Sequence, residues 1–193
     1  MKPASFARLC ALALLICVAP AAHAVTLTIS PSLQNVALGD PVSVNLVISG
    51  LGDGVPPSLR GFDLDVSFDS DILVLVGAQL NAPLGGNAQF GFDVQPTGSG
   101  AVVNLFALSD LSGPELDALQ GDEFTIATLI FNTLGAGTSG LILGNVVLTS
   151  GTGGALPLDV GFNGQVVVPE PATSLGVGLG LLALALRRGR LRG

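Results

Sequence analysis

Apolar and polar residues alternate along much of the chain, which is the pattern of half-buried β-strands. In residues 42–48 every second residue is Val, Leu or Ile, and in residues 61–68 Phe, Leu and Val alternate with Gly, Asp and Ser. We therefore expect one face of each strand in the core and the other at the surface. Further strands are expected at 26–30, 72–78, 88–94, 101–108, 123–133, 141–149 and 165–168.

Clusters of Gly, Pro, Asn, Asp and Ser separate these segments, for example at 50–57 and 135–140. Residues 114–119 alone have the pattern of a short helical turn. Nine strands with irregular spacing and almost no helix predict an all-β fold, a two-sheet sandwich of the jelly-roll type. Residues 25–168 have the size of one domain with its own core.

Residues 1–24 have the three parts of a secretory signal peptide. A basic start is followed by an apolar run over residues 9–18 and by the small-residue tripeptide Ala22-His23-Ala24. We expect cleavage between Ala24 and Val25. The apolar run is shorter than the about 20 residues of a bilayer span, which disfavours the alternative of an uncleaved anchor. The cut would leave a mature chain without His, Cys, Lys, Trp or Tyr.

Residues 169–193 also have three parts. In order, these are Pro169-Glu170-Pro171, an apolar stretch at 175–186, and an arginine cluster that starts with Arg187 and Arg188. Physical chemistry alone predicts a marginal hydrophobic helix whose arginines lie on the cytoplasmic side of a membrane. The stretch is short for a permanent span and could be a buried core helix, but the adjoining arginines favour the membrane.

This order of parts resembles the PEP-CTERM sorting signal of bacteria that make exopolysaccharide. The resemblance implies that a membrane-embedded exosortase recognises the Pro-Glu-Pro tripeptide and processes the tail. It also implies that residues 25–168 are secreted to the cell envelope or the extracellular matrix. The C-terminal helix would then anchor the protein in the inner membrane, either transiently or stably.

The charge of the expected domain restricts its partners. Residues 25–168 contain 13 acidic residues but one basic residue, Arg60, which gives a formal charge of −12. Such a surface repels phosphate backbones and excludes nucleic acid as a partner. The acidity either keeps an exported protein soluble or attracts Ca²⁺, a cationic partner or sugar hydroxyls, and composition leaves these alternatives open.

Catalytic chemistry has few residues to use in the mature chain. A nucleophilic hydrolase lacks His, Lys or Cys to act as base or nucleophile, and transition metals lose their nitrogen and sulfur ligands. A glycosidase would need paired carboxylates, and it usually also needs aromatic platforms, but Trp and Tyr are absent. We therefore expect no enzyme and no cofactor, with Ca²⁺ left open as a ligand.

Several segments together resemble the cohesin family, the β-sandwich modules that bind dockerin domains in cellulosome scaffoldins. Residues 60–77 read RGFDLDVSFDSDILVLVG, residues 103–107 read VNLFA, residues 121–131 read GDEFTIATLIF, and residues 162–168 read FNGQVVV. The resemblance spans almost all of residues 25–168. It implies a nine-stranded jelly roll with a flat sheet face, formed partly by residues 61–68, that receives the partner.

The resemblance also implies a site on that face. Asp63 falls where dockerin-binding cohesins often present a hydrogen-bonding acid, whereas Gly61 falls where many of them carry Asn. Asp65 lies on the same face, about 7 Å further along the strand. This pair is the predicted partner site, the alternative being two solvated surface carboxylates. For Asp69 and Asp71 we expect turn chemistry, since Asp side chains bond nearby main-chain groups.

The sequence thus predicts an exported, non-catalytic cohesin-like module that binds a dockerin-type protein through a sheet face. The alternative is a polysaccharide-binding or structural protein of the exopolysaccharide matrix, without a dockerin partner. The two hypotheses differ in whether a dockerin-type domain exists to be bound.

Overall fold

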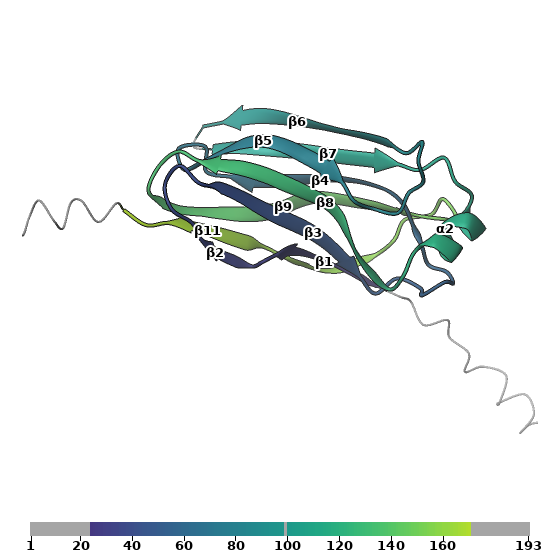
Figure 1. Ribbon diagram of the computed structural model, residues 1–193. Helices are drawn as coiled ribbons and strands as arrows, with labels where there is room; N and C mark the ends of the chain where they lie inside the picture. Colours follow the sequence, from purple (N-terminus) through teal and green to yellow (C-terminus); the bar gives the residue numbers. More distant parts are fainter. Residues whose placement is uncertain (1–23, 99, 171–193) are drawn as a thin grey trace, which may run out of the picture.

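Two β-sheets packed face to face, with one short helix at an end, make up the computed structural model over its described residues, 24–98 and 100–170 (Figure 1). One sheet has five strands in the order β10-β1-β3-β8-β5, and the other has six in the order β2-β11-β9-β4-β7-β6. The strands are β1 (Val25–Ser30), β2 (Leu33–Asn35), β3 (Pro41–Ser49), β4 (Leu59–Phe68), β5 (Leu73–Leu80), β6 (Gln89–Thr97), β7 (Gly100–Leu108), β8 (Glu123–Thr133), β9 (Gly137–Ser150), β10 (Leu158–Phe162) and β11 (Gly164–Val168). Helix α2 (Gly113–Leu119) connects β7 to β8.

The predicted all-β jelly-roll sandwich and its short helix are confirmed. All nine expected strands are present, and the structure adds two short ones, β2 and β10. Each added strand lies at a sheet edge and pairs in parallel, β2 with β11 and β10 with β1. A three-residue strand such as β2 is too short for alternation to reveal.

The core lies between the two sheets because every second side chain of the central strands points inward. On β4 the side chains of Phe62, Leu64, Val66 and Phe68 are buried. The ring of Phe68 packs edge-to-face on that of Phe131 from β8, with ring centres 5.1 Å apart and planes at 70°. This aromatic pair joins the two sheets directly.

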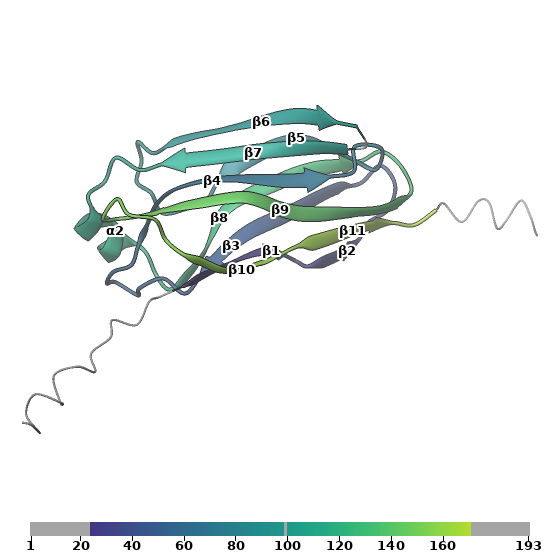
Figure 2. The ribbon, with the colours of Figure 1, turned by 180° about the vertical axis from the view of Figure 1, so that it is seen from behind.

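The two ends of the sandwich differ. Figures 1 and 2 show that β1 begins at the end that carries α2, whereas β11 ends at the opposite end. Val25 is the first residue of β1 and is fully buried, and its N–H donates to the carbonyl of Pro157 at 3.0 Å. Ala24 before it is exposed.

Parts of the predicted terminal signals lie outside the described residues. These are residues 1–23 of the leader, Pro171, the apolar stretch, and the cluster with Arg187 and Arg188. Among residues 24–98 and 100–170, no helix has the length and apolar character needed to cross a bilayer.

Candidate partner-binding face

Strand β4 presents the predicted site residues on the outward side of the six-stranded sheet. Its inward side chains fill the core, so the side chains of Asp63, Asp65 and Ser67 point outward. Gly61, in the same alternate series, has no side chain and is buried. Because β4 pairs with β7 on one side and β9 on the other, both carboxylates lie within the sheet and away from its edges. Asp63 is exposed and Asp65 is half-buried.

Two asparagine side chains hold these carboxylates in place. Asn104 of β7 lies opposite Asp65, and its Nδ2 donates to Oδ1 of Asp63 at 2.7 Å and to Oδ1 of Asp65 at 3.0 Å. Nδ2 of Asn145 on β9 donates to Oδ2 of Asp65. Oδ2 of Asp63 accepts no hydrogen bond from residues 24–98 or 100–170. The bridging amides therefore fix both acids and leave Oδ2 of Asp63 without a hydrogen bond from the described residues.

A β-bulge brings Asn145 to this position. Opposite β4, Asp63 pairs with Val147 and Asp65 pairs with Gly144, so β9 has one residue more than the regular pairing needs. Asn145 has φ +46°, a left-handed conformation that Asn adopts more readily than most residues. Bulges commonly re-aim a side chain in this way, and here the amide is turned toward Asp65.

Exposed apolar side chains surround the polar cluster. Phe106 of β7 and Val147 of β9 lie opposite Asp63, on either side of it, and are 46% and 59% exposed. The ring of Phe106 lies over Gly91 of β6, where an added Cβ would come within 2.4 Å of it. Glycine at 91 thus lets the ring lie across the neighbouring strand. Leu108 and Ile142, 50% and 52% exposed, extend the apolar surround along the same face.

We call this surface the Asp63 face. Its residues are Asp63, Asp65, Asn104, Phe106, Leu108, Ile142, Asn145 and Val147. It combines a central hydrogen-bonded polar cluster with exposed apolar neighbours. No group of three or more His, Cys, Asp or Glu side chains suited to a metal ion occurs among residues 24–98 and 100–170.

The expected turn chemistry is confirmed for Asp69, whereas the carboxylate of Asp71 accepts no hydrogen bond from residues 24–98 or 100–170. Oδ1 of Asp69 accepts a hydrogen bond from the N–H of Asp71 at 2.9 Å, and its carbonyl accepts one from Leu73. This local bonding forms the turn between β4 and β5. Asp69 and Asp71 thus do not join the Asp63 face.

Sequence reasoning missed the residues that support the two acids. Asn104 lies in the expected strand 101–108, where an outward Asn in an otherwise apolar run was a usable signal. Gly144-Asn145 inside the expected strand 141–149 was another signal, because such a pair within a strand pattern indicates a bulge. The two asparagines come from strands far apart in the chain, so their convergence required the sheet order.

Of the predicted sorting residues, Pro169 and Glu170 are exposed and follow β11 directly. The family model of the PEP-CTERM protein-sorting motif matches residues 167–190, so the match begins inside the last strand. A motif of this class is typical of exported proteins that are sorted to the cell envelope. No curated protein sequence matches the chain.

Solved cohesin structures share the fold. The chain is similar to the sixth cohesin of scaffoldin B from Acetivibrio cellulolyticus, solved with a Cel5 dockerin (17% identity, 75% of this chain and 99% of that one, TM-score 0.58). It is also similar to the OlpA cohesin of Clostridium thermocellum, solved with a dockerin (11% identity, 75% and 99%, TM-score 0.61). A non-cellulosomal cohesin from the archaeon Archaeoglobus fulgidus matches as well (17% identity, 76% and 92%, TM-score 0.53). The chain is a cohesin-fold protein that carries a PEP-CTERM sorting motif.

Proposed function

We propose that this protein is an exported, non-catalytic binding module that is sorted to the cell envelope and binds a dockerin-type protein through the Asp63 face. The observation that carries the proposal is the pair of carboxylates fixed by Asn104 and Asn145 within a ring of exposed apolar side chains. Binding energy in protein interfaces concentrates in such central clusters, while the surrounding apolar contacts exclude water.

The polar cluster suits a partner that donates hydrogen bonds. Amide donors already orient both acids, so little side-chain entropy remains to be lost on binding. The uncommitted Oδ2 of Asp63 can accept from a partner hydroxyl, amide or cationic group. The formal charge of −12 over residues 25–168 favours a partner with basic groups and accelerates its encounter at low salt.

The solved neighbours support a protein partner. Both the Acetivibrio cellulolyticus and the Clostridium thermocellum cohesins were solved in complex with dockerins. Dockerin recognition by this chain is part of the proposal. Many such cohesins carry Asn at the position of Gly61, so a dockerin-type partner would have to make a different contact there. Leu108 of β7, which lies opposite Gly61, is available for an apolar contact at that point.

The terminal segments account for the proposed export and sorting of the protein. Signal cleavage between Ala24 and Val25 releases the domain 25–168, and residues 169–193 direct sorting. An exosortase-type enzyme recognises Pro169-Glu170-Pro171, while the arginines that start with Arg187 and Arg188 stop the tail at the inner membrane. The match to a sorting motif over residues 167–190 supports this part of the proposal.

A pull-down with the full-length protein tests the proposal. The bait is incubated, with and without Ca²⁺, with exported proteins and with exopolysaccharide from the producing bacterium. We expect capture of a protein with a dockerin-type domain, lost with the Asp63→Ala variant and kept with Asp53→Ala, which removes an equal charge from an exposed loop. Retention on polysaccharide alone, unchanged by Asp63→Ala, would contradict dockerin recognition and favour a matrix protein.

A further inference from the structure

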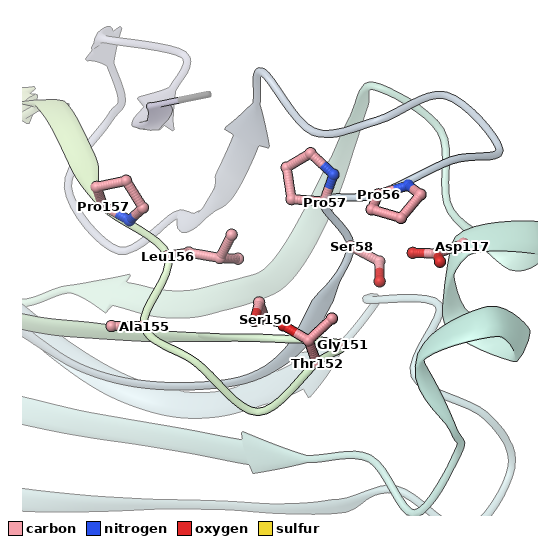
Figure 3. A pocket seen from close by; sticks show the side chains of 10 residues that line it. All are labelled: Pro56, Pro57, Ser58, Asp117, Ser150, Gly151, Thr152, Ala155, Leu156 and Pro157. Carbon is pink, nitrogen blue, oxygen red and sulfur yellow. Dashed lines mark hydrogen bonds between the residues drawn. The ribbon is translucent and has the colours of Figure 1, made fainter. Parts of the chain in front are cut away.

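A hollow of about 410 Å³ lies at the end of the sandwich near α2, apart from the Asp63 face (Figure 3). Three separate segments form its walls: the loop before β4, helix α2, and the turn between β9 and β10. The lining residues are Pro56, Pro57, Ser58, Asp117, Ser150, Gly151, Thr152, Ala155, Leu156 and Pro157. Its volume is in the range of small-ligand pockets, about 300–1,000 Å³.

Main-chain hydrogen bonds hold these walls together. The N–H of Gly151 donates to the carbonyl of Ser58 at 2.9 Å, which ties the turn after β9 to the loop before β4. Within the turn, the N–H of Ser150 donates to the carbonyl of Gly154 at 2.7 Å. On α2, the buried Leu116 anchors the helix in the core next to Asp117. The pocket is therefore preformed and needs little ordering when a ligand enters.

Ser58 gives this pocket an unusual polar group. The residue is 2% exposed, and its hydroxyl Oγ is buried without a hydrogen-bond partner among residues 24–98 and 100–170. A Cβ at Gly151 would lie 2.4 Å from this Oγ, so glycine there leaves the room that the hydroxyl occupies. Burying an unpaired hydroxyl costs free energy, and a rotation of the Ser58 side chain that brings Oγ to the pocket surface would let a ligand hydroxyl recover it.

The remaining lining determines the class of ligand. Asp117 is the one formally charged residue in it, so an anionic ligand is disfavoured. Among the described residues that line the pocket none is aromatic, so they form no cation–π cage for a quaternary ammonium group. In Figure 3 the Asp117 carboxylate and the Ser58 hydroxyl lie on the same side of the pocket, opposite Leu156 and Pro157.

We propose that this pocket binds a neutral sugar unit of a polysaccharide. Asp117 accepts hydrogen bonds from sugar hydroxyls, and the Ser58 hydroxyl exchanges one with them. The rings of Pro56, Pro57 and Pro157 offer flat C–H surfaces to the apolar face of the sugar. The protein would then hold a protein partner on one surface and a glycan on another.

The position of the pocket suits a glycan outside the cell. The residues that line it come from α2 and the neighbouring loops. Figure 1 shows that α2 lies at one end of the sandwich and that β11 ends at the other. A protein tethered through its C-terminus therefore points the pocket away from the tether. This orientation rests on the sorting proposed above, but sugar binding in solution does not.

Calorimetric titration of the full-length protein, held in a zwitterionic detergent without a sugar headgroup, tests the proposal. The probes are pentasaccharides of glucose, galactose, mannose and xylose, with a lysine-rich peptide as the cationic comparison. We expect one pentasaccharide to bind and Asp117→Asn to weaken it about tenfold, since the sugar hydroxyl then donates to a neutral amide oxygen in place of a charged carboxylate. Ala155→Trp should abolish binding by filling the pocket.

Two controls separate this site from other effects. Asp110→Asn changes an exposed acid in the loop before α2 that does not line the pocket, and it should leave sugar affinity unchanged. Asp63→Ala should also leave it unchanged, even if it ends capture of the protein partner. Absence of pentasaccharide binding at millimolar concentration, binding that survives both pocket variants, or binding of the lysine-rich peptide alone would overturn the proposal.

Discussion

At the scale of single residues, Gln120 shows how one side chain joins distant parts of the fold. Its Oε1 accepts from the N–H of Leu59 at 2.6 Å, and its Nε2 donates to the carbonyl of Leu59 at 2.6 Å. The same Nε2 lies 3.2 Å from the carbonyl of Pro83. Gln120 is 2% exposed, so it satisfies buried main-chain groups at the start of β4 that have no access to water.

Replacing Gln120 with Ala should lower the free energy of unfolding by about 3 kcal/mol, because both main-chain groups of Leu59 lose their partner. Urea denaturation of the full-length protein measures the change. The matched variant Gln79→Ala, at an exposed position of β5, should stay within about 0.5 kcal/mol of the unchanged protein. Equal losses in the two variants would refute the bridging role of Gln120.

Asn145 has a double role that two substitutions separate. Asn145→Ala removes the hydrogen bond to Asp65 and strains the left-handed backbone, whereas Asn145→Gly removes the bond but relaxes the backbone. We expect the Ala variant to be less stable than the Gly variant by about 1 kcal/mol, measured by thermal unfolding. Both should bind the protein partner more weakly, and full binding by Asn145→Gly would show that the amide does not position Asp65.

At the scale of elements, the start of α2 depends on a charged cap. The Glu115 carboxylate accepts hydrogen bonds from the hydroxyl of Ser112 at 2.6 Å and from its N–H at 2.8 Å. These two bonds, the hydroxyl first, hold the pKa of Glu115 below its ordinary value. Since the pKa is lower in the folded state, the stabilisation is complete above the ordinary value and disappears as the pH falls through the folded one.

The difference in stability between the unchanged protein and Glu115→Gln should follow this dependence. It should be largest above the ordinary glutamate pKa of about 4.3 and shrink as the pH falls below it. Thermal unfolding over a pH series measures it. Ser112→Ala removes the stronger of the two bonds and should reduce the difference, and a difference that grows toward low pH would contradict the cap.

The strands that the sequence predicted are those with one buried face, because burial on one side is what makes apolar and polar residues alternate. On β4 this alternation also indicated that Asp63 and Asp65 share the outward face. The edge strand β2 was missed because three residues carry too little pattern. The contribution of Asn104 and Asn145 was missed because it depends on which strands are neighbours, and alternation contains no information about sheet order.

At the scale of the whole molecule, the folded domain and the sorting motif meet without a linker. The motif match begins at residue 167, yet Val166 and Val168 of β11 are buried in the core. Pro169 and Glu170 then line a hollow of about 370 Å³ with residues 35–38. The last strand of the sandwich therefore leads directly into the segment proposed for sorting.

A pair of variants tests where the domain ends. Val166→Ala should lower the free energy of unfolding by about 2 kcal/mol, because it removes buried methyl groups from the core. Ending the chain after Glu170 should change it by less than about 0.5 kcal/mol, since every core residue of the described ranges 24–98 and 100–170 is kept. Urea denaturation measures both, and a large loss in the shortened chain would place the domain boundary beyond residue 170.

Footprinting by radical labelling, read by mass spectrometry, tests the central claim most directly, because it reports which face the protein partner covers. The full-length protein is labelled with and without the dockerin-type partner captured in the pull-down. We predict protection of Phe106, Ile142 and Val147 on the Asp63 face, with Val74 and Val76 on the outward side of β5 labelled as before. Protection of the two β5 residues with unchanged labelling of Phe106 would contradict the account.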